Sequence, residues 1–176
     1  MILTLEEAQK VKPDATQDDL DAFEAAVRQL TSNNFQNHHV RYYGLFIGAD
    51  NAVEIGTSPE GLRVGDTVQL SESNFNNGLY TIKALTDTGM VLDGQEMFKG
   101  TFPKAFLTKI EYPPDIKAGI LKLLAYDAKM ADKLGIKSET IARMSVTYYD
   151  SNATENVDGY PASLMGFLSK YNKMRW

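Results

Sequence analysis

Histidine is the side chain that most often ligates metal ions and moves protons near neutral pH, and this chain has two, the neighbours His38 and His39. Neighbouring side chains of an extended segment point to opposite faces, so the pair is poorly placed to share one metal ion. The chain has no cysteine that could complete such a site or act as a nucleophile. We therefore expect both histidines to lie at a loop edge, where a helix gives way to a strand.

A second group of candidate metal ligands lies in the segment 150–159. Its oxygen-bearing side chains recur as they do in a calcium-binding loop: Asp150, Asn152, Thr154, Glu155 and Asp158. A calcium loop also needs a glycine at its sixth position and an acidic residue at its twelfth, and this segment has Glu155 and Pro161 there. We interpret the segment as a solvated acidic loop that holds no metal.

The remaining sequence offers no arrangement suited to catalysis. The stretch "GTSPEG", residues 56–61, lacks the Gly-x-Ser-x-Gly spacing of a nucleophile elbow, and no glycine-rich phosphate loop occurs. The carboxylate pairs Glu6-Glu7 and Asp18-Asp19 stand where helices are expected to begin, and the helix dipole stabilises acidic residues there. We therefore predict that the protein is not an enzyme and uses no cofactor.

The composition is that of a globular protein, since 43% of the 176 residues are hydrophobic and 23% are charged. The net charge of −5 argues against a dedicated nucleic-acid binder, although an acidic wall suits brief passage of DNA because it repels phosphate. The absence of cysteine is compatible with a reducing compartment. No apolar run approaches the ~20 residues of a membrane helix, and the first residues do not resemble a signal peptide.

Capping residues predict helices near both ends of the chain. Thr4 and Glu7 form a capping-box pattern for a short helix, and Thr16 caps a second one. A third helix is expected from Pro114 onward and a final one from Pro161, because proline is tolerated in a first turn. The apolar residues expected to be buried are Leu20, Phe23, Val27 and Leu30 on the second helix, and Ile116, Ile120, Leu123, Leu124, Ala131 and Leu134 on the third.

Between Val40 and Tyr112 the pattern changes to short alternating runs rich in β-branched and aromatic residues. Residues 76–78, Asn-Asn-Gly, predict a hairpin within them. About five such runs predict a small antiparallel barrel or sandwich, and the alternative is a long hairpin packed on the helices. The predicted fold class is α+β, with an α-helical frame of about four helices and an inserted small β-barrel or β-sandwich-like module. The expected segments are 1–36, 37–112 and 113–176.

Four stretches of the predicted helical frame resemble a known family when they are taken in order. They are "LTLEEAQ", "YPPDIKAGILKLLAYDAKM", "GIKSETIARMSVTYYD" and "GYPASLMGFLSKYNKMRW". Together they are similar to the head–tail connector (adaptor, head-completion) proteins of long-tailed bacteriophages and prophages. The resemblance covers residues 1–33 and 113–176. Two departures are Ala142-Arg143, where the family often has Gly-Asp, and the long segment 40–112, whose role cannot be carried over.

The resemblance implies a virion structural protein, made in the bacterial host cytoplasm and located in the neck between head and tail. Its copies would form a ring of about a dozen subunits closed by cyclic symmetry. The ring would bind the portal protein, extend the DNA channel without reading its sequence, and offer a docking surface to the next neck or tail protein. No membrane is implied.

Two segments are the expected interfaces. An alternating segment, Ser145–Tyr149, can dock on another chain, unless it pairs with the inserted module or covers its own helices. The chain end is rich in aromatic residues and arginine, as interface hot spots are, unless it folds back on its own core. The residues expected to contact a neighbouring copy are Lys137, Ser138, Glu139, Thr140, Ile141, Ser145 and Val146. Those expected to dock on the portal are Tyr171, Lys173, Met174, Arg175 and Trp176.

Two other functions stay open. One is a small-barrel binding module, for nucleic acid or for regulation, carried on a helical frame. A nucleic-acid barrel should cluster its basic residues with stacked aromatics, whereas those of the predicted insert are scattered along the sequence: Arg41, Arg63, Lys83, Lys99, Lys104 and Lys109. The other is a neighbouring neck protein, such as a stopper or tail-completion protein.

Overall fold

A computed structural model describes residues 1–131, 138–141, 144–147, 156–157, 159 and 160–174 of the chain. The chain divides into two compact units. The barrel unit comprises Met1 and Asn34–Glu111, and the helical unit comprises Ile2–Asn33 and Tyr112–Trp176. Each unit is described by itself below.

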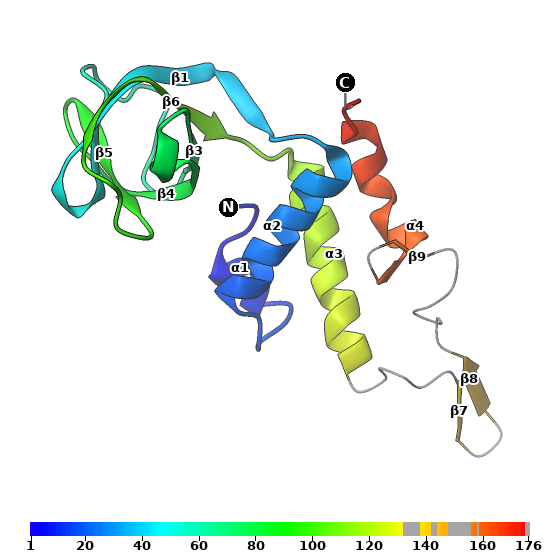
Figure 1. Ribbon diagram of the computed structural model, residues 1–176. Coiled ribbons are helices and arrows are strands. Elements are labelled where there is room, and N and C mark those ends of the chain that lie inside the picture. The colour runs from blue at the N-terminus through cyan, green and yellow to red at the C-terminus, as the bar shows by residue number, and fades with distance from the viewer. Residues whose placement is uncertain (132–137, 142–143, 148–155, 158, 175–176) are drawn as a thin grey trace. The chain divides into compact units, whose positions relative to one another are not determined.

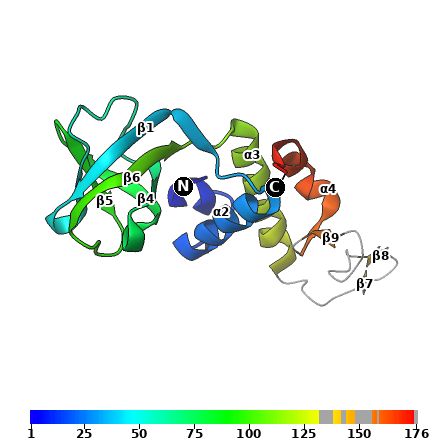
Figure 2. The same cartoon turned by 45° about the horizontal axis from the view of Figure 1, so that its top comes forward.

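The barrel unit is a closed antiparallel β-barrel of six strands, in the order β1-β2-β5-β4-β3-β6 (Figure 1). The strands are β1 (Gln36–Ile47), β2 (Ala52–Glu54), β3 (Thr67–Ser71), β4 (Gly78–Leu85), β5 (Gly89–Asp93) and β6 (Gly100–Ile110). The two longest, β1 and β6, pair with each other along most of their length, as Figures 1 and 2 show. Closure matters because it leaves no barrel strand with an open edge.

Alternation of side chains along these strands fills the barrel with apolar groups. The buried core consists of Leu45, Ile47, Val53, Ile55, Leu62, Val68, Leu70, Ile82, Met90, Leu92, Met97, Ala105 and Leu107. Several of these side chains, among them Ile47, Val68 and Leu107, are fully inaccessible to solvent. The barrel therefore has a hydrophobic core of its own.

The two ends of the barrel segment are tied to each other. The Phe35 carbonyl accepts a hydrogen bond of 2.9 Å from the Glu111 amide. The Asn37 side chain donates another, of 2.8 Å, to the Glu111 carboxylate. The chain therefore enters and leaves the barrel at one place.

The connection between β3 and β4 differs from the predicted tight turn. The strands pair antiparallel, as a hairpin requires, with Leu70 opposite Gly78. The residues between them include a 3₁₀ turn, η2 (Asn74–Asn76), and left-handed backbone at Glu72 and Asn74. The hairpin was thus predicted, but its turn is longer than two residues.

The first two helices agree with the prediction. Helix α1 (Leu5–Gln9) begins at Thr4 and α2 (Gln17–Thr31) begins at Thr16, and both have the reciprocal hydrogen bonds of a capping box. On α2, Leu20 and Val27 are buried, whereas Leu30 is 39% exposed. The predicted stripe is therefore correct in its middle and wrong at its end.

Helix α3 (Pro114–Met130) packs against the C-terminal elements α4 (Ala162–Met165) and η4 (Gly166–Tyr171), the latter a 3₁₀ helix. Its buried face contains the expected Ile116, Ile120, Leu123 and Leu124, whereas Ala131 is exposed. Leu134 lies outside the described residues.

A close approach holds the C-terminal elements on α3. A Cβ atom at Gly119 would lie only 2.4 Å from the Phe167 ring. Any larger residue at Gly119 would displace that ring, so glycine is what lets the two segments meet.

Two small antiparallel pairs complete the described chain. Strands β7 (Ser138–Ile141) and β8 (Met144–Thr147) form one two-stranded sheet, and β9 (Asn156–Val157) and β10 (Tyr160–Pro161) form another. No helix among the described residues is both long and apolar enough to cross a membrane.

The predicted fold class, an α-helical frame carrying a β insert, is wrong. The closed six-stranded barrel is the main architecture, and the helices are small. Helices α1 and α4 have 5 and 4 residues, and the predicted last helix is mostly 3₁₀. The physical reason is that the apolar spacing of Leu164, Phe167 and Leu168 suits a 3₁₀ turn as well as an α-helix. The run after α3 is β-branched and forms strands.

Candidate functional site

The predicted neighbour-contact segment forms a β-hairpin. Glu139 lies opposite Val146, Thr140 opposite Ser145, and Ile141 opposite Met144. Ser138–Ile141 thus form one strand of the pair, and Lys137 lies outside the described residues. Among the strands of the described chain, β7 and β8 pair only with each other. Each strand thus has one outer edge whose backbone groups no described strand uses.

The predicted portal-docking end is held within its own unit. The Tyr171 hydroxyl donates a hydrogen bond of 2.5 Å to Asp115, and the Tyr171 carbonyl accepts one of 3.3 Å from the Asn33 side chain. The Lys173 amide donates to the Thr31 carbonyl at 2.8 Å. Met174 follows with 79% of its surface exposed, and Arg175 and Trp176 lie outside the described residues. The Tyr171 hydroxyl is thus used within the chain, whereas the Met174 side chain is available.

Asp115 is the charged centre of this contact. Hydrogen bonds from Lys170 first, and then from Tyr171, hold the pKa of the Asp115 carboxyl below its ordinary value. The same carboxylate raises the pKa of Tyr171. Because Asp115 lies in the first turn of α3, a negative charge there is also favoured by the helix dipole.

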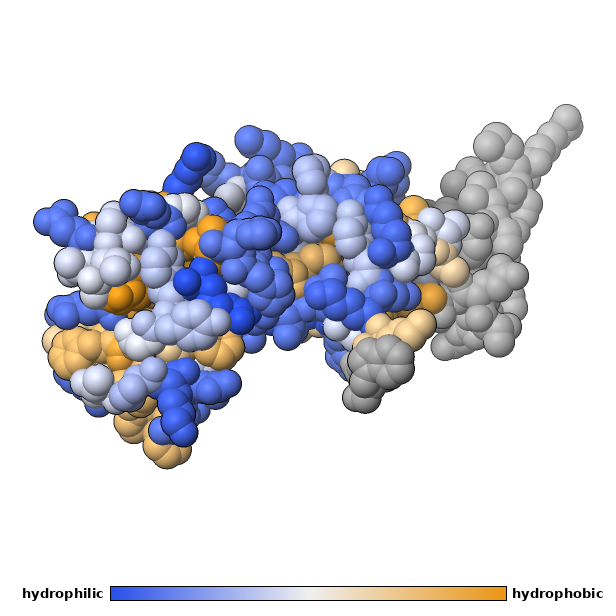
Figure 3. Space-filling view, turned by 90° about the horizontal axis from the view of Figure 1, so that it is seen from above, coloured by the Kyte–Doolittle hydropathy of each residue, from blue (hydrophilic) through white to orange (hydrophobic). Residues whose placement is uncertain are grey.

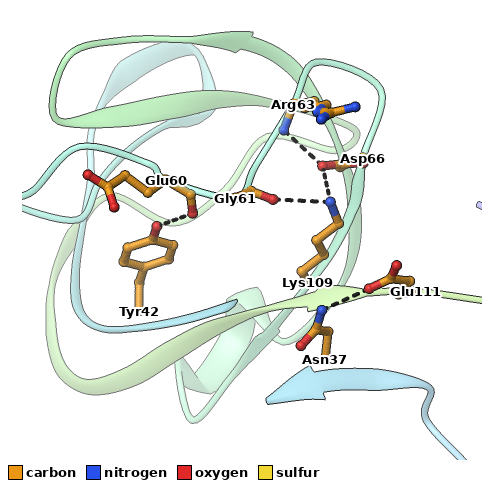
Figure 4. A network of polar contacts seen from close by, with 8 residues as sticks. All are labelled: Asn37, Tyr42, Glu60, Gly61, Arg63, Asp66, Lys109 and Glu111. Atoms are coloured by element: carbon orange, nitrogen blue, oxygen red, sulfur yellow. Dashed lines mark hydrogen bonds and ion pairs between the residues drawn. The ribbon is translucent and has the colours of Figure 1, made fainter. Parts of the chain in front are cut away.

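A polar network fixes a long loop of the barrel unit, residues 56–66 (Figure 4). The Lys109 ammonium pairs with Asp66 at 2.7 Å and donates to the Gly61 carbonyl at 3.1 Å. The Tyr42 hydroxyl donates to the Glu60 carbonyl at 2.5 Å, and burial raises the pKa of this tyrosine. Leu62 of the same loop is buried in the barrel core. These contacts are structural, since each polar group is used to hold the loop.

Exposed apolar side chains mark the outside of the barrel, visible as orange atoms at the left of Figure 3. Phe75 and Phe98 are 80% and 63% exposed, and their ring centroids are 5.2 Å apart. Buried Asn76 fixes this pair, because its side chain accepts from the Phe98 amide at 2.8 Å and donates to the Phe98 carbonyl at 2.9 Å. The pairing of Phe75 with Phe98 was not predicted, because the two residues come from different loops of the barrel.

The two histidines lie inside strand β1 rather than at the predicted loop edge. Residue Asn37 pairs with Lys109 and Arg41 with Thr108, so residues 38–40 form a bulge between consecutive partners. His38 faces Arg41 with its Nδ1 atom 2.7 Å from the arginine Nη2. Among the described residues, no group of three or more potential ligands could hold a metal ion.

An arginine–aromatic cluster, Arg41 with His38, Tyr43 and Phe106, is the feature that sequence reasoning missed. The Arg41 guanidinium carbon lies 4.7 Å from the centre of the Phe106 ring. The ring of Tyr43, which follows on β1, has its centre 5.7 Å from the centre of the same Phe106 ring. The pattern "HHVRYY" held part of the information, but Phe106 comes from β6, and only the strand register brings it here.

Comparisons with known proteins assign no function to these surfaces. Neither the models of protein families nor the curated proteins include a match to this chain. The function is therefore argued from the geometry and from the resemblance of the four sequence stretches.

Proposed function

We propose that the protein is a virion structural protein, a head–tail connector (adaptor) of the bacteriophage neck. Copies would form a ring of about a dozen under the portal, extend the DNA channel, and present a docking surface to the next neck protein. The four sequence stretches described above are the starting point of this proposal. One structural observation carries it further, the hairpin β7–β8.

The hairpin is built for contact with another chain. A two-stranded hairpin alone is at best marginally stable in water, and its open edges can pair with a further strand. In the described residues β7 and β8 pair with no third strand. Six residues of these two strands, Ser138, Glu139, Thr140, Ile141, Ser145 and Val146, were expected to contact the neighbouring copy. A partner strand added at either edge would supply backbone hydrogen bonds that the described strands do not supply.

The C-terminal end gives a second contact of smaller size. Truncation of the chain end tests this contact. Removal of the last six residues would also remove the hydrogen bonds that Tyr171 and Lys173 make within the helical unit. Removing only residues 174–176 spares them. We expect that shorter truncation to leave the helical unit folded and to abolish docking on the portal. A folded truncation that still docks on the portal would contradict this role.

Electron microscopy of lysates from a phage or prophage that lacks the gene tests the function itself. Full-size heads that lose DNA, together with free tails, are the expected result. Complementation with the wild-type gene should restore joined particles. Complementation with Thr140→Pro should not, because proline removes an N–H and disrupts the hairpin. Normal tailed particles from the deletion would overturn the connector proposal.

A small-barrel binding module is the second candidate function. The observation that favours it is the arginine–aromatic cluster, which gathers an arginine and exposed aromatic surface on the outside of the barrel. Normal tailed particles in the lysate of the gene deletion would favour this binding function over the connector function.

A further inference from the structure

The arginine–aromatic cluster is assembled by two irregularities of the β1–β6 pair. The first is the bulge of residues 38–40, and the second lies between Tyr43 and Leu45, where Gly44 has a left-handed φ of 72°. Irregularities of this kind change the direction of side chains and are frequent beside functional sites. Between the two, Arg41 pairs with Thr108 and Tyr43 with Phe106 in regular register. The four side chains of the cluster therefore lie on one stretch of the sheet.

The guanidinium of Arg41 is held in a single orientation. Its Nε donates to the Thr108 hydroxyl at 2.9 Å, and Nη2 donates to Gln36 at 3.3 Å and lies 2.7 Å from His38 Nδ1. The Phe106 ring supports it from one side by a cation–π contact. Fixing a long side chain in advance removes much of the entropy that binding would otherwise cost.

The held guanidinium still has donors to offer. An arginine has five N–H groups, and the contacts above use those on Nε and Nη2. Within the described residues, Nη1 has no acceptor and the guanidinium pairs with no carboxylate. Because Arg41 can only donate, His38 Nδ1 must accept, which leaves the proton of the neutral imidazole on Nε2. Two donor positions, Nη1 and His38 Nε2, thus have no acceptor among the described residues and can bind one from outside.

The free N–H donors suit an oxyanion as ligand. The surrounding charges favour a carboxylate of a protein over the phosphates of a nucleic acid. Nucleic acid needs several cations along its backbone. Of the other cations of the barrel, Lys109 is already engaged with Asp66, and Arg63, Lys83, Lys99 and Lys104 are not part of the cluster. The chain as a whole has a net charge of −5, which repels a polyphosphate. A single carboxylate suits an arginine that has only Nη1 left to donate, because one charge-assisted hydrogen bond needs no second cation.

Tyr43 adds an apolar requirement. It is 64% exposed and extends the aromatic surface beside the guanidinium, so a bound group can cover it. We propose that the arginine–aromatic cluster binds an acidic segment of a partner protein, in which an Asp or Glu side chain pairs with Arg41 and an adjacent large apolar side chain packs on Tyr43. Arginine and tyrosine are the residues most enriched in interface hot spots. The proposal does not depend on the connector function.

Nuclear magnetic resonance titrations with defined probes test this site. The main probe is the acetylated and amidated dipeptide Glu-Phe, followed through the side-chain signals of Arg41 and His38. The dipeptide Gln-Phe removes the charge, and Glu-Ala removes the apolar side chain. Inorganic phosphate and a single-stranded oligothymidylate test the alternative ligands. We expect saturable shifts with Glu-Phe, and binding about tenfold weaker with Gln-Phe, because a charge-assisted hydrogen bond is lost.

Substitutions assign the binding to this cluster. Arg41→Gln should weaken Glu-Phe binding about tenfold, and Tyr43→Ala should bring Glu-Phe binding to the level of Glu-Ala. Arg63→Gln is the matched control, since it removes the same charge from the same barrel and should leave binding unchanged. Circular dichroism verifies that each variant is folded. Equal binding of Gln-Phe and Glu-Phe would overturn the proposal, as would the absence of shifts at Arg41. Tighter binding of phosphate or oligothymidylate that depends on Arg41 would overturn it in favour of a phosphate ligand.

Discussion

The two units of the chain are stabilised in different ways. The barrel closes on itself, so its backbone ladder is complete and its core of 13 buried side chains is enclosed by six strands. The helical unit is stabilised by the buried faces of α2 and α3, and its short C-terminal elements are held on α3 by individual contacts, such as Phe167 at Gly119 and Tyr171 at Asp115. Stability in the barrel is therefore distributed over a closed sheet, whereas the C-terminal elements of the helical unit depend on a few positions.

The difference suits the functions proposed for each unit. A closed barrel can hold exposed side chains in fixed positions, as it does for Phe75, Phe98 and Arg41, because its scaffold does not depend on them. Terminal elements held by a few contacts, as α4 and η4 are, can reorganise when a partner offers replacements. We therefore expect surface substitutions to be tolerated in the barrel and contact substitutions to matter in the helical unit.

The largest expected effect is a loss of stability of the barrel. Leu107→Ala removes a side chain with no exposed surface from the core, and should lower the free energy of unfolding of the barrel by about 3 kcal/mol. Hydrogen exchange should show lost protection in β3 and β6 with little change in α3. Leu79→Ala, at a side chain that is 40% exposed, is the control. Equal loss of protection in α3 would show that the two units unfold together.

The next effect breaks the helical unit at one contact. Gly119→Leu would place side-chain atoms where the Phe167 ring lies, and should destabilise the helical unit by about 2 kcal/mol through overpacking. Thermal unfolding measures the change. The double substitution with Phe167→Ala frees space and should recover part of the loss. A double variant no more stable than Gly119→Leu alone would mean that the ring is not the obstacle.

A smaller effect tests how the barrel holds its exposed aromatic pair. Asn76→Ala leaves the Phe98 amide and carbonyl without their partners, and should cost about 1–2 kcal/mol. Asn76→Asp also loses the donor and places a carboxylate beside the Phe98 carbonyl in a buried position, so it should cost at least as much when stability is measured by urea unfolding at neutral pH. Gln95→Ala, at an exposed residue of the β5–β6 loop that carries Phe98, should change little. If Asn76→Ala unfolds at the same urea concentration as the wild type, the two bonds contribute nothing.

The smallest effect appears only in acid. Lys170 and Tyr171 lower the pKa of Asp115 in the folded chain from its ordinary value of 3.8, so the folded state favours the ionised carboxyl. This stabilisation is fully present above pH 3.8 and is lost as the pH falls through the lowered pKa. Asp115→Asn should therefore reduce the dependence of helical-unit stability on pH in acid, measured by circular dichroism. Asp14→Asn, at an exposed aspartate of the same unit, should keep the wild-type dependence.

Local patterns in the sequence predicted local structure well. The two capping boxes at Thr4 and Thr16 were predicted because a cap needs only residues within one turn. The start of α3 at Pro114 follows from the same local logic. The strand-rich segment was also located, since alternation and β-branched residues are local features.

Contacts between distant residues were not predicted. The closed strand order places β6 between β1 and β3, a register that no local pattern specifies. The arginine–aromatic cluster depends on that register, because Arg41 and Thr108 are 67 residues apart. The helical frame was overestimated for the same reason, since apolar spacing cannot tell a 3₁₀ turn from an α-helix when tertiary packing decides.

The joined ends of the barrel have a consequence for how such a chain can be altered. The Phe35 carbonyl accepts a hydrogen bond from the Glu111 amide, so the two segments that connect the barrel to the rest of the chain lie side by side. If Asn34–Glu111 were replaced by a short turn, the chain would have to close only a short loop, which costs little entropy. Because its two ends meet, the barrel segment could also be circularly permuted, with a new start in one of its loops and the present ends joined to each other.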